Sequence, residues 1–209
     1  MHTKKIKVSS DGCGMVKALD EVENFGHAMG FAPRDALRCR LLAEETLGMV
    51  KAIVEDFTAA FWVESRKVIS FELHLRGEAD MNLRKKQDLI EASTRQRNEA
   101  AVGFMGKILD FIEDSLLTIA DDAAISATYT NSIGSMLIED NVYLWSLEKY
   151  RRDVQGVKEG RADLLDELEK SLVARIADDV KVSVTGSRIE MTISKNFPVQ
   201  VSVREEDLT

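Results

Sequence analysis

The chain has 209 residues, of which 44% are hydrophobic and 31% are charged, and this balance is that of a folded globular protein rather than a disordered one. Lysine and arginine number 28 against 36 acidic residues, so the formal charge is 28 − 36 = −8. A net negative charge argues against a nucleic acid or an anionic membrane as the partner. No run of 18 apolar residues occurs, so no transmembrane helix is predicted.

The cysteines and the N-terminal segment bear on the cellular compartment. Cys13 and Cys39 form no CxxC motif, and "MHTKKIKVSS" has no apolar signal core. We therefore predict a cytoplasmic protein with reduced cysteines. No spacing of histidine, cysteine and acidic residues fits a zinc site, so no metal is predicted.

The first elements in chain order are a short strand and two helices. Residues 4–9 alternate polar and apolar side chains, which predicts a strand. A helical pattern covers residues 14–29. A second helix begins at Pro33, a residue that favours the first helical turn, and runs to about residue 56.

This second helix carries two adjacent carboxylates in "LLAEETLGMV". Glu45 falls on the side of the predicted inward stripe, and Glu44 lies on the neighbouring side. The pair is open to two interpretations, a general base and a solvated helix edge. The predicted inward stripe consists of Leu42, Met49, Ile53 and Phe57.

Two segments have the alternation of β-hairpins. "TAAFWVES" and "KVISFELHLRG" are joined by a short polar connection and predict the first hairpin. His74 lies on the polar face of its second strand and is expected to be exposed. "VKVSVTGSRIEMTIS" alternates on both sides of Gly186 and Ser187 and predicts the second hairpin. "VQVSV", residues 199–203, predicts a further edge strand.

Helical patterns dominate the segment between the hairpins. A basic helix is predicted over residues 81–91, and an amphipathic helix with three-and-four spacing extends from Val102 to Ile119. Residues 121–141 are less regular and predict a loop or short turns. Helical periodicity resumes at Leu144 and returns over residues 161–178.

Two segments, taken with the order of the elements, resemble a known family. "LLAEETLGMV" is similar to the helix on which histidine-kinase-like ATPases carry a Glu for water activation and, four residues later, an Asn for Mg²⁺. "SLVARIADDVKVSVTGSRIEMTISK" is similar to their final helix, hairpin and terminal-strand Lys, here Lys195. This superfamily includes gyrase, the histidine kinases and the anti-sigma-factor serine kinases. The resemblance covers about half of the chain and implies ATP and Mg²⁺ as ligands, with Glu45 as the catalytic base.

The positions that would bind the nucleotide depart from the family's pattern. Met49 stands where the family has its Asn, and a thioether is a poor ligand for a hard cation. "LRGEADM", with Arg76 and Gly77, stands where the family has an Asp-x-Gly-x-Gly loop, and an arginine cannot accept a hydrogen bond from adenine. "ELEKSLV" replaces a Gly-x-Gly-Leu-Gly turn, and its Glu167 and Glu169 would repel phosphate.

The predicted fold is an α/β two-layer sandwich of the histidine-kinase-like ATPase type, with a mixed, mainly antiparallel sheet covered by helices. One domain is predicted over residues 1–209. Residues 1–81 and 161–203 would form the scaffold, and a helical insertion would occupy about residues 82–160.

Two functions remain open. The first is a regulatory or protein-interaction protein on a degenerate ATPase scaffold, without ATP hydrolysis, which binds a protein partner or a second copy of itself. The second is a divergent ATP-binding protein or serine kinase of the anti-sigma-factor type, with Glu45 as its base. The residues at the degenerate nucleotide site would be Glu44, Glu45, Met49, Arg76, Gly77, Arg95 and Arg97.

Overall fold

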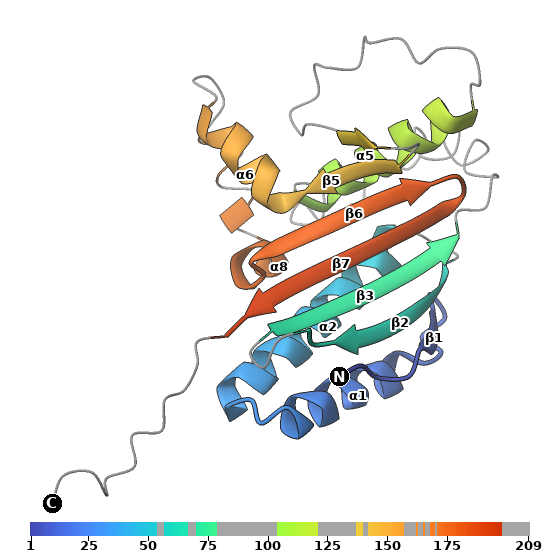
Figure 1. Cartoon of the computed structure of the whole chain (residues 1–209). Helices are drawn as coiled ribbons and strands as arrows, with labels where there is room; N and C mark the ends of the chain where they lie inside the picture. Colours follow the sequence, from blue (N-terminus) through green and yellow to red (C-terminus); the bar gives the residue numbers. More distant parts are fainter. Residues whose placement is uncertain are drawn as a thin grey trace, which may run out of the picture.

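The structure is a computed structural model of the whole chain (Figure 1). It describes residues 1–53, 57–66, 70–78, 104–120, 137–139, 142–156, 162, 165, 168, 169 and 171–197.

One sheet of seven strands forms the centre of the molecule, in the order β1-β2-β3-β7-β6-β5-β4. The strands are β1 (Ile6–Ser9), β2 (Thr58–Glu64), β3 (Ser70–Glu78), β4 (Leu137–Glu139), β5 (Val142–Ser146), β6 (Asp179–Thr185) and β7 (Arg188–Asn196). Both predicted hairpins, β2–β3 and β6–β7, are confirmed. The prediction of a mixed sheet is wrong for the described strands, because all of their pairings are antiparallel.

Helices pack against one face of this sheet, which gives a two-layer α+β arrangement. The described helices are α1 (Met15–Ala28), α2 (Pro33–Ile53), α5 (Phe104–Ala120), α6 (Leu147–Gly156) and α8 (Leu172–Ile176). In Figure 1, α2 lies behind β2 and β3, α1 lies below β2, and α5 lies behind β5. Among the described helices, none is both long and apolar enough to cross a membrane.

The alternation of side chains in the strands explains why the core lies on one side only. Phe71, Leu73 and Leu75 of β3 point towards the helices and are buried. Phe25 of α1 meets Phe71 edge-on, with ring centroids 6.3 Å apart. The described helices leave the opposite face of β2, β3 and β7 uncovered (Figure 1).

The segment between the hairpins is not wholly helical, and this corrects the predicted helical insertion. The helix predicted from Val102 to Ile119 is confirmed as α5, but Leu144 belongs to strand β5 and not to a helix. Tyr143 and Trp145 alternate with it and face the core, where Trp145 pairs with Val182 of β6. The sheet therefore continues through β5 and β4.

The helix predicted over residues 161–178 is interrupted at Ser171. The backbone of Ser171 is extended, and its hydroxyl accepts a hydrogen bond from the backbone N–H of Ala174 at 3.3 Å. This N-cap begins the short helix α8, since a serine there satisfies a backbone donor that the helix leaves free. The predicted helix at residues 81–91 and the edge strand at 199–203 lie outside the described residues.

Candidate functional site

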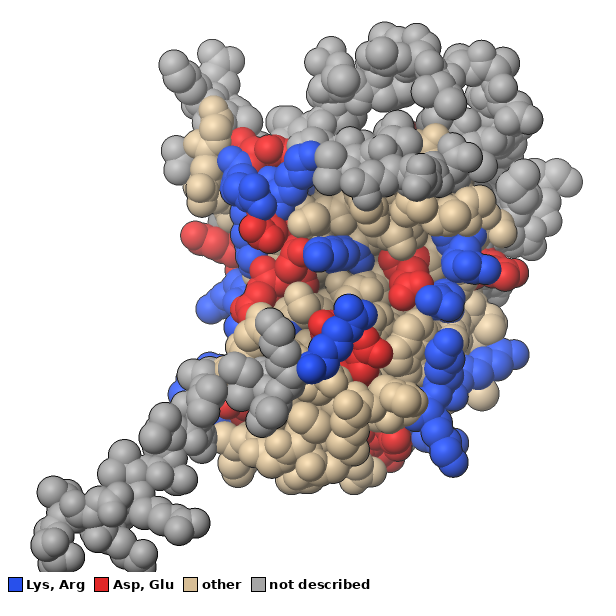
Figure 2. Space-filling model, viewed as in Figure 1, with Lys and Arg blue, Asp and Glu red and all other residues tan. Residues whose placement is uncertain are grey.

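The uncovered face of the sheet brings acidic residues and a histidine together. The register of the β2–β3 hairpin places Glu64 opposite Glu72, and Trp62 opposite His74. On the other side of β3, His74 lies opposite Thr192 of β7. Residues directly opposite each other on one face have Cβ atoms about 4.5–5.5 Å apart, so their side chains touch. Figure 2 shows both signs of charge on this face.

His74 is buried on this face, and the prediction that it is exposed is wrong. Its ring stacks on Trp62, with centroids 4.7 Å apart and planes 4° apart. Lys5 Nζ lies 4.6 Å from the Trp62 ring centre, and the Arg76 guanidinium lies 5.4 Å from it. His74 is only 5% exposed and Trp62 only 8%. An aromatic neighbour on the adjacent strand has shielded a residue that alternation alone assigns to solvent.

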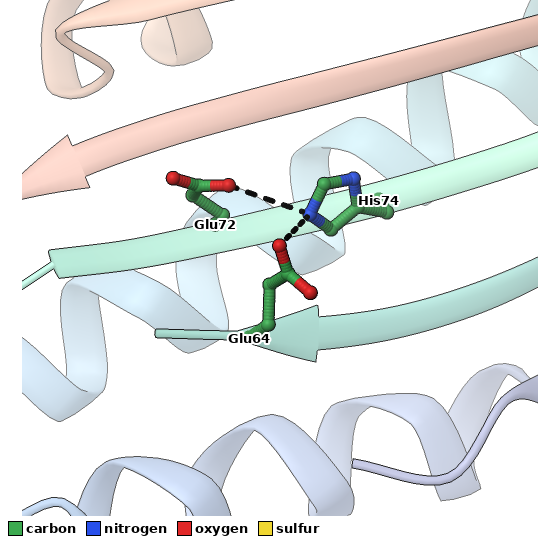
Figure 3. A group of neighbouring side chains, drawn as sticks. All are labelled: Glu64, Glu72 and His74. Atoms are coloured by element: carbon green, nitrogen blue, oxygen red, sulfur yellow. Dashed lines mark ion pairs between the residues drawn. The ribbon is translucent and has the colours of Figure 1, made fainter. Parts of the chain in front are cut away.

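Glu64, Glu72 and His74 form a compact cluster, which we call the Glu-Glu-His cluster (Figure 3). His74 Nε2 lies 3.4 Å from Glu64 Oε1 and 3.7 Å from Glu72 Oε2. One ligand atom from each of the three residues lies within 4.8 Å of the other two. The carboxylates point towards the same ring nitrogen from two neighbouring strands, as Figure 3 shows.

Arg66 contacts the same two carboxylate oxygens. Its Nε lies 3.0 Å from Glu64 Oε1 and 3.3 Å from Glu72 Oε2. The Arg66 side chain is 70% exposed, whereas the two glutamates are only 24% and 20% exposed. The guanidinium therefore approaches the cluster from solvent.

The two nitrogens of the His74 ring have different surroundings. Nδ1 lies 3.1 Å from Thr192 Oγ1 and 3.7 Å from Glu190 Oε1. Nε2 is buried and has no hydrogen-bond partner among the described residues. When Nδ1 carries the proton and donates a hydrogen bond to Thr192 Oγ1, the lone pair of Nε2 points at two carboxylates.

Burial and neighbouring charges shift the pKa values of His74 and Glu64 in this cluster. Burial lowers the pKa of His74 below its ordinary value, against the attraction of Glu64, Glu190 and Glu72 for a protonated ring. Burial also works to raise the pKa of Glu64, but the hydrogen bond from Arg66 and the charges of His74 and Arg66 outweigh it, so the pKa of Glu64 is lowered.

Stability should therefore fall between about pH 7 and pH 5 in a way that depends on His74. Below the ordinary histidine pKa of about 6.5, His74 takes up a proton in the unfolded chain, whereas in the folded chain its lowered pKa keeps it neutral to a lower pH. The free energy of unfolding is therefore lost as pH falls from about 6.5 through the lower folded pKa. Each unit of lowering corresponds to about 1.4 kcal/mol. In urea unfolding, H74Q should lose less stability than the wild type between these pH values. H27Q, which removes an exposed histidine, is the control, and an equal loss in H74Q would contradict the prediction.

Glu44 and Glu45 lie in the other layer of the structure. Glu44 is exposed and Glu45 is half-buried on α2. Leu42 of the predicted stripe is fully buried, and Phe57 is partly buried against the core. Thr46, one turn after Leu42, is fully buried as well, and its hydroxyl donates to the Leu42 carbonyl at 2.6 Å. The described stripe is Ala36, Cys39, Leu42, Ala43, Thr46 and Leu47. The side chains of Met49 and Ile53 lie outside the described residues.

Arg76 and Gly77 have structural partners on β2 and β7. Arg76 donates from Nε to Glu190 Oε2 at 2.8 Å, and its Nη2 lies 2.6 Å from the same oxygen. A Cβ at Gly77 would lie 3.3 Å from the Thr58 carbonyl oxygen, so the position favours glycine for strand packing. Arg95 and Arg97 lie outside the described residues.

Lys195, at the end of β7, is held by an acid. Its Nζ lies 2.6 Å from Asp178 Oδ1, and the backbone N–H of Asn196 donates to Asp178 Oδ2 at 2.7 Å. Burial works to raise the pKa of Asp178, but these hydrogen bonds and the charge of Lys195 lower it. The charge of Lys195 is thus balanced within the fold.

The chain was compared with known proteins. No family model, no curated protein and no solved structure matches it.

Sequence reasoning missed the Glu-Glu-His cluster because it searched for ligands along the chain. Glu64, Glu72 and His74 match no zinc spacing, and they meet only across the hairpin. The signal lay in the predicted hairpin itself. Once Glu64 is aligned with Glu72, alternation places His74 on the same face, two residues further along β3.

Proposed function

We propose that the protein is a regulatory protein that binds a protein partner, on a histidine-kinase-like ATPase scaffold that does not hydrolyse ATP. The observed order of elements supports the scaffold. Helix α2 is followed by the β2–β3 hairpin, then by the segment that contains α5, and finally by α8 and the β6–β7 hairpin. The resemblance implies this order of elements.

One observation supports the proposed lack of ATP hydrolysis: the residues that would form the nucleotide site lie on opposite sides of the sheet. Glu45 is on α2, on the helical side of the sheet, whereas Arg76 lies on the uncovered face beside Trp62 and Glu190. Lys195 already contacts Asp178. A general base has nothing to act on unless phosphate ligands converge beside it.

Isothermal titration with ATP and with ADP, each with and without Mg²⁺, tests this proposal. We expect no heat at protein concentrations that would detect a dissociation constant of about 1 mM, equivalent to about −4 kcal/mol. A second temperature excludes a binding enthalpy of zero. Micromolar binding that E45A abolishes would instead favour the divergent ATP-binding protein or serine kinase.

A second copy of the chain is the first protein partner to test. The uncovered face carries cations such as Lys5 and Arg66 beside carboxylates such as Glu72 and Glu190, a mixture that suits a protein surface better than a polyanion. Sedimentation equilibrium of the wild type and of the double variant R95E/R97E measures self-association. Arg95 and Arg97 belong to a basic segment, residues 84–97, of a chain whose formal charge is −8, so this segment suits an acidic surface of a partner. We therefore expect the double variant to associate less, and a wild type that stays monomeric at every concentration would exclude a second copy as the partner.

A further inference from the structure

The Glu-Glu-His cluster has an excess of negative charge around a buried nitrogen. Two carboxylate oxygens face His74 Nε2 at 3.4 and 3.7 Å, and Nε2 makes no hydrogen bond to any described residue. A buried polar atom without a partner costs free energy, and in the tautomer with the proton on Nδ1 two carboxylates that face the Nε2 lone pair cost more. We propose that Glu64, Glu72 and His74 bind one divalent first-row transition-metal ion, and that Arg66 occupies its place when the ion is absent.

The separations within the cluster suit such an ion. A metal bound at about 2.0–2.2 Å by nitrogen and oxygen ligands in tetrahedral geometry holds those ligands about 3.3–3.6 Å apart. The two separations from His74 Nε2 are 3.4 and 3.7 Å. Small rotations of the carboxylates are therefore enough to complete three protein ligands, with solvent taking the remaining position.

The surroundings of His74 prepare Nε2 as the ligand. Metal-bound histidines characteristically donate their other ring N–H to an oxygen, which selects the tautomer and orients the ring. Thr192 Oγ1 lies 3.1 Å from Nδ1, where it can accept that hydrogen bond, and Glu190 Oε1 lies at 3.7 Å. The stacked Trp62 ring holds the imidazole plane from the adjacent strand.

The donor set indicates the class of metal. One imidazole nitrogen with two carboxylate oxygens suits zinc and its neighbours in the first row. Magnesium and calcium prefer sites made of oxygen alone. Because imidazole is a ligand only when neutral, burial that disfavours the protonated ring also favours metal binding.

Arg66 is the built-in competitor of the ion. Its Nε contacts Glu64 Oε1 and Glu72 Oε2, which are the two oxygens that also face His74 Nε2. A metal ion cannot use both oxygens while the guanidinium holds them. Because the Arg66 side chain is 70% exposed, it can move into solvent when the ion binds.

Titration of the purified protein with Zn²⁺ tests the proposal through a gain of affinity. We expect one site per chain, and R66A should bind Zn²⁺ at least about fivefold more tightly than the wild type because the competing cation is gone. R152A is the matched control, since Arg152 is 69% exposed and pairs with Glu148 on α6. Equal affinities for R66A and R152A, or the absence of any site in both, would overturn the proposal.

The ligands themselves are tested by loss of affinity and by the histidine signals. H74Q and E64Q should each weaken Zn²⁺ binding at least about tenfold, whereas H27Q should leave it unchanged. The chain has three histidines, so nitrogen-15 spectra of their rings show directly which ring nitrogen shifts with Zn²⁺. We expect Nε2 of His74 to shift, and a shift confined to His2 or His27 would refute the site. If H74Q fails to fold, the R66A and R152A comparison and the wild-type spectra still decide.

The outcome is independent of the proposed lack of ATP hydrolysis. The Zn²⁺ titrations contain no nucleotide, and the ATP titrations concern positions on α2 and at the end of β3. If H74Q loses Zn²⁺ binding but gives the same result as the wild type in the ATP titrations, the metal proposal and the proposed function are tested separately.

Discussion

Replacing Gly14 by alanine should destabilise the protein by about 2–5 kcal/mol. Gly14 precedes α1 with φ +75° and ψ −10°, a left-handed conformation that costs a residue with a Cβ about 1–2 kcal/mol. A Cβ there would also lie 1.9 Å from the Lys7 carbonyl oxygen of β1. Backbone atoms cannot yield as a side chain can, so β1 or the start of α1 must shift, at a further cost of about 1–3 kcal/mol. Urea unfolding measures the difference.

Gly12 supplies the matched control for this substitution. It has φ +92° in the same connection, but a Cβ at Gly12 would meet nothing within 4 Å. G12A should therefore show the conformational cost of about 1–2 kcal/mol without the collision. If G14A proved no more destabilising than G12A, the close approach of Gly14 to β1 would be wrong.

The substitution of Phe71 by alanine should cost about 3–5 kcal/mol, the range for a large buried aromatic side chain. Phe71 is fully buried near the start of β3 and contacts Phe25 of α1 edge-on. Its removal leaves a cavity between the sheet and the helical layer. Thermal and urea unfolding measure the loss, and F71L, which keeps much of the volume, should lose clearly less.

Leu37 gives the opposite control. It is a large hydrophobic residue of α2 that is 64% exposed, so L37A should change stability by no more than about 0.5 kcal/mol. A loss for F71A as small as that for L37A would mean that the helices do not pack on this face of β3.

The regular alternation of the two hairpins is what made half of the fold predictable. Phe71, Leu73 and Leu75 share a face because side chains in a strand alternate, and no tertiary contact is needed to infer this. Strand β5 was missed for a related reason. Leu144 and Leu147 are three residues apart, as in a helix, and the residues that decide the matter, Tyr143 and Trp145, become core residues only through β6.

From the sequence, the candidate site was predictable only as part of the polar face of β3. Alternation correctly separates His74 from the core side of β3, but it does not show that Trp62 covers the ring. Nor does it show that the acids of two strands meet at one nitrogen, because that depends on the register of the hairpin. Thr46 shows the converse limit on α2, since a hydroxyl bonded to its own helix is buried as readily as an apolar side chain.

Among the described strands, the two at the ends of the sheet are the shortest, with four residues in β1 and three in β4. A strand that ends a sheet offers unpaired backbone groups to any other extended chain, and fibrils can grow by adding strands there. Borders this short present few such groups in register. Short edge strands therefore discourage the pairing of one sheet with another, edge to edge. An ordered complex of this protein should instead form through the broad face of the sheet or through its helices.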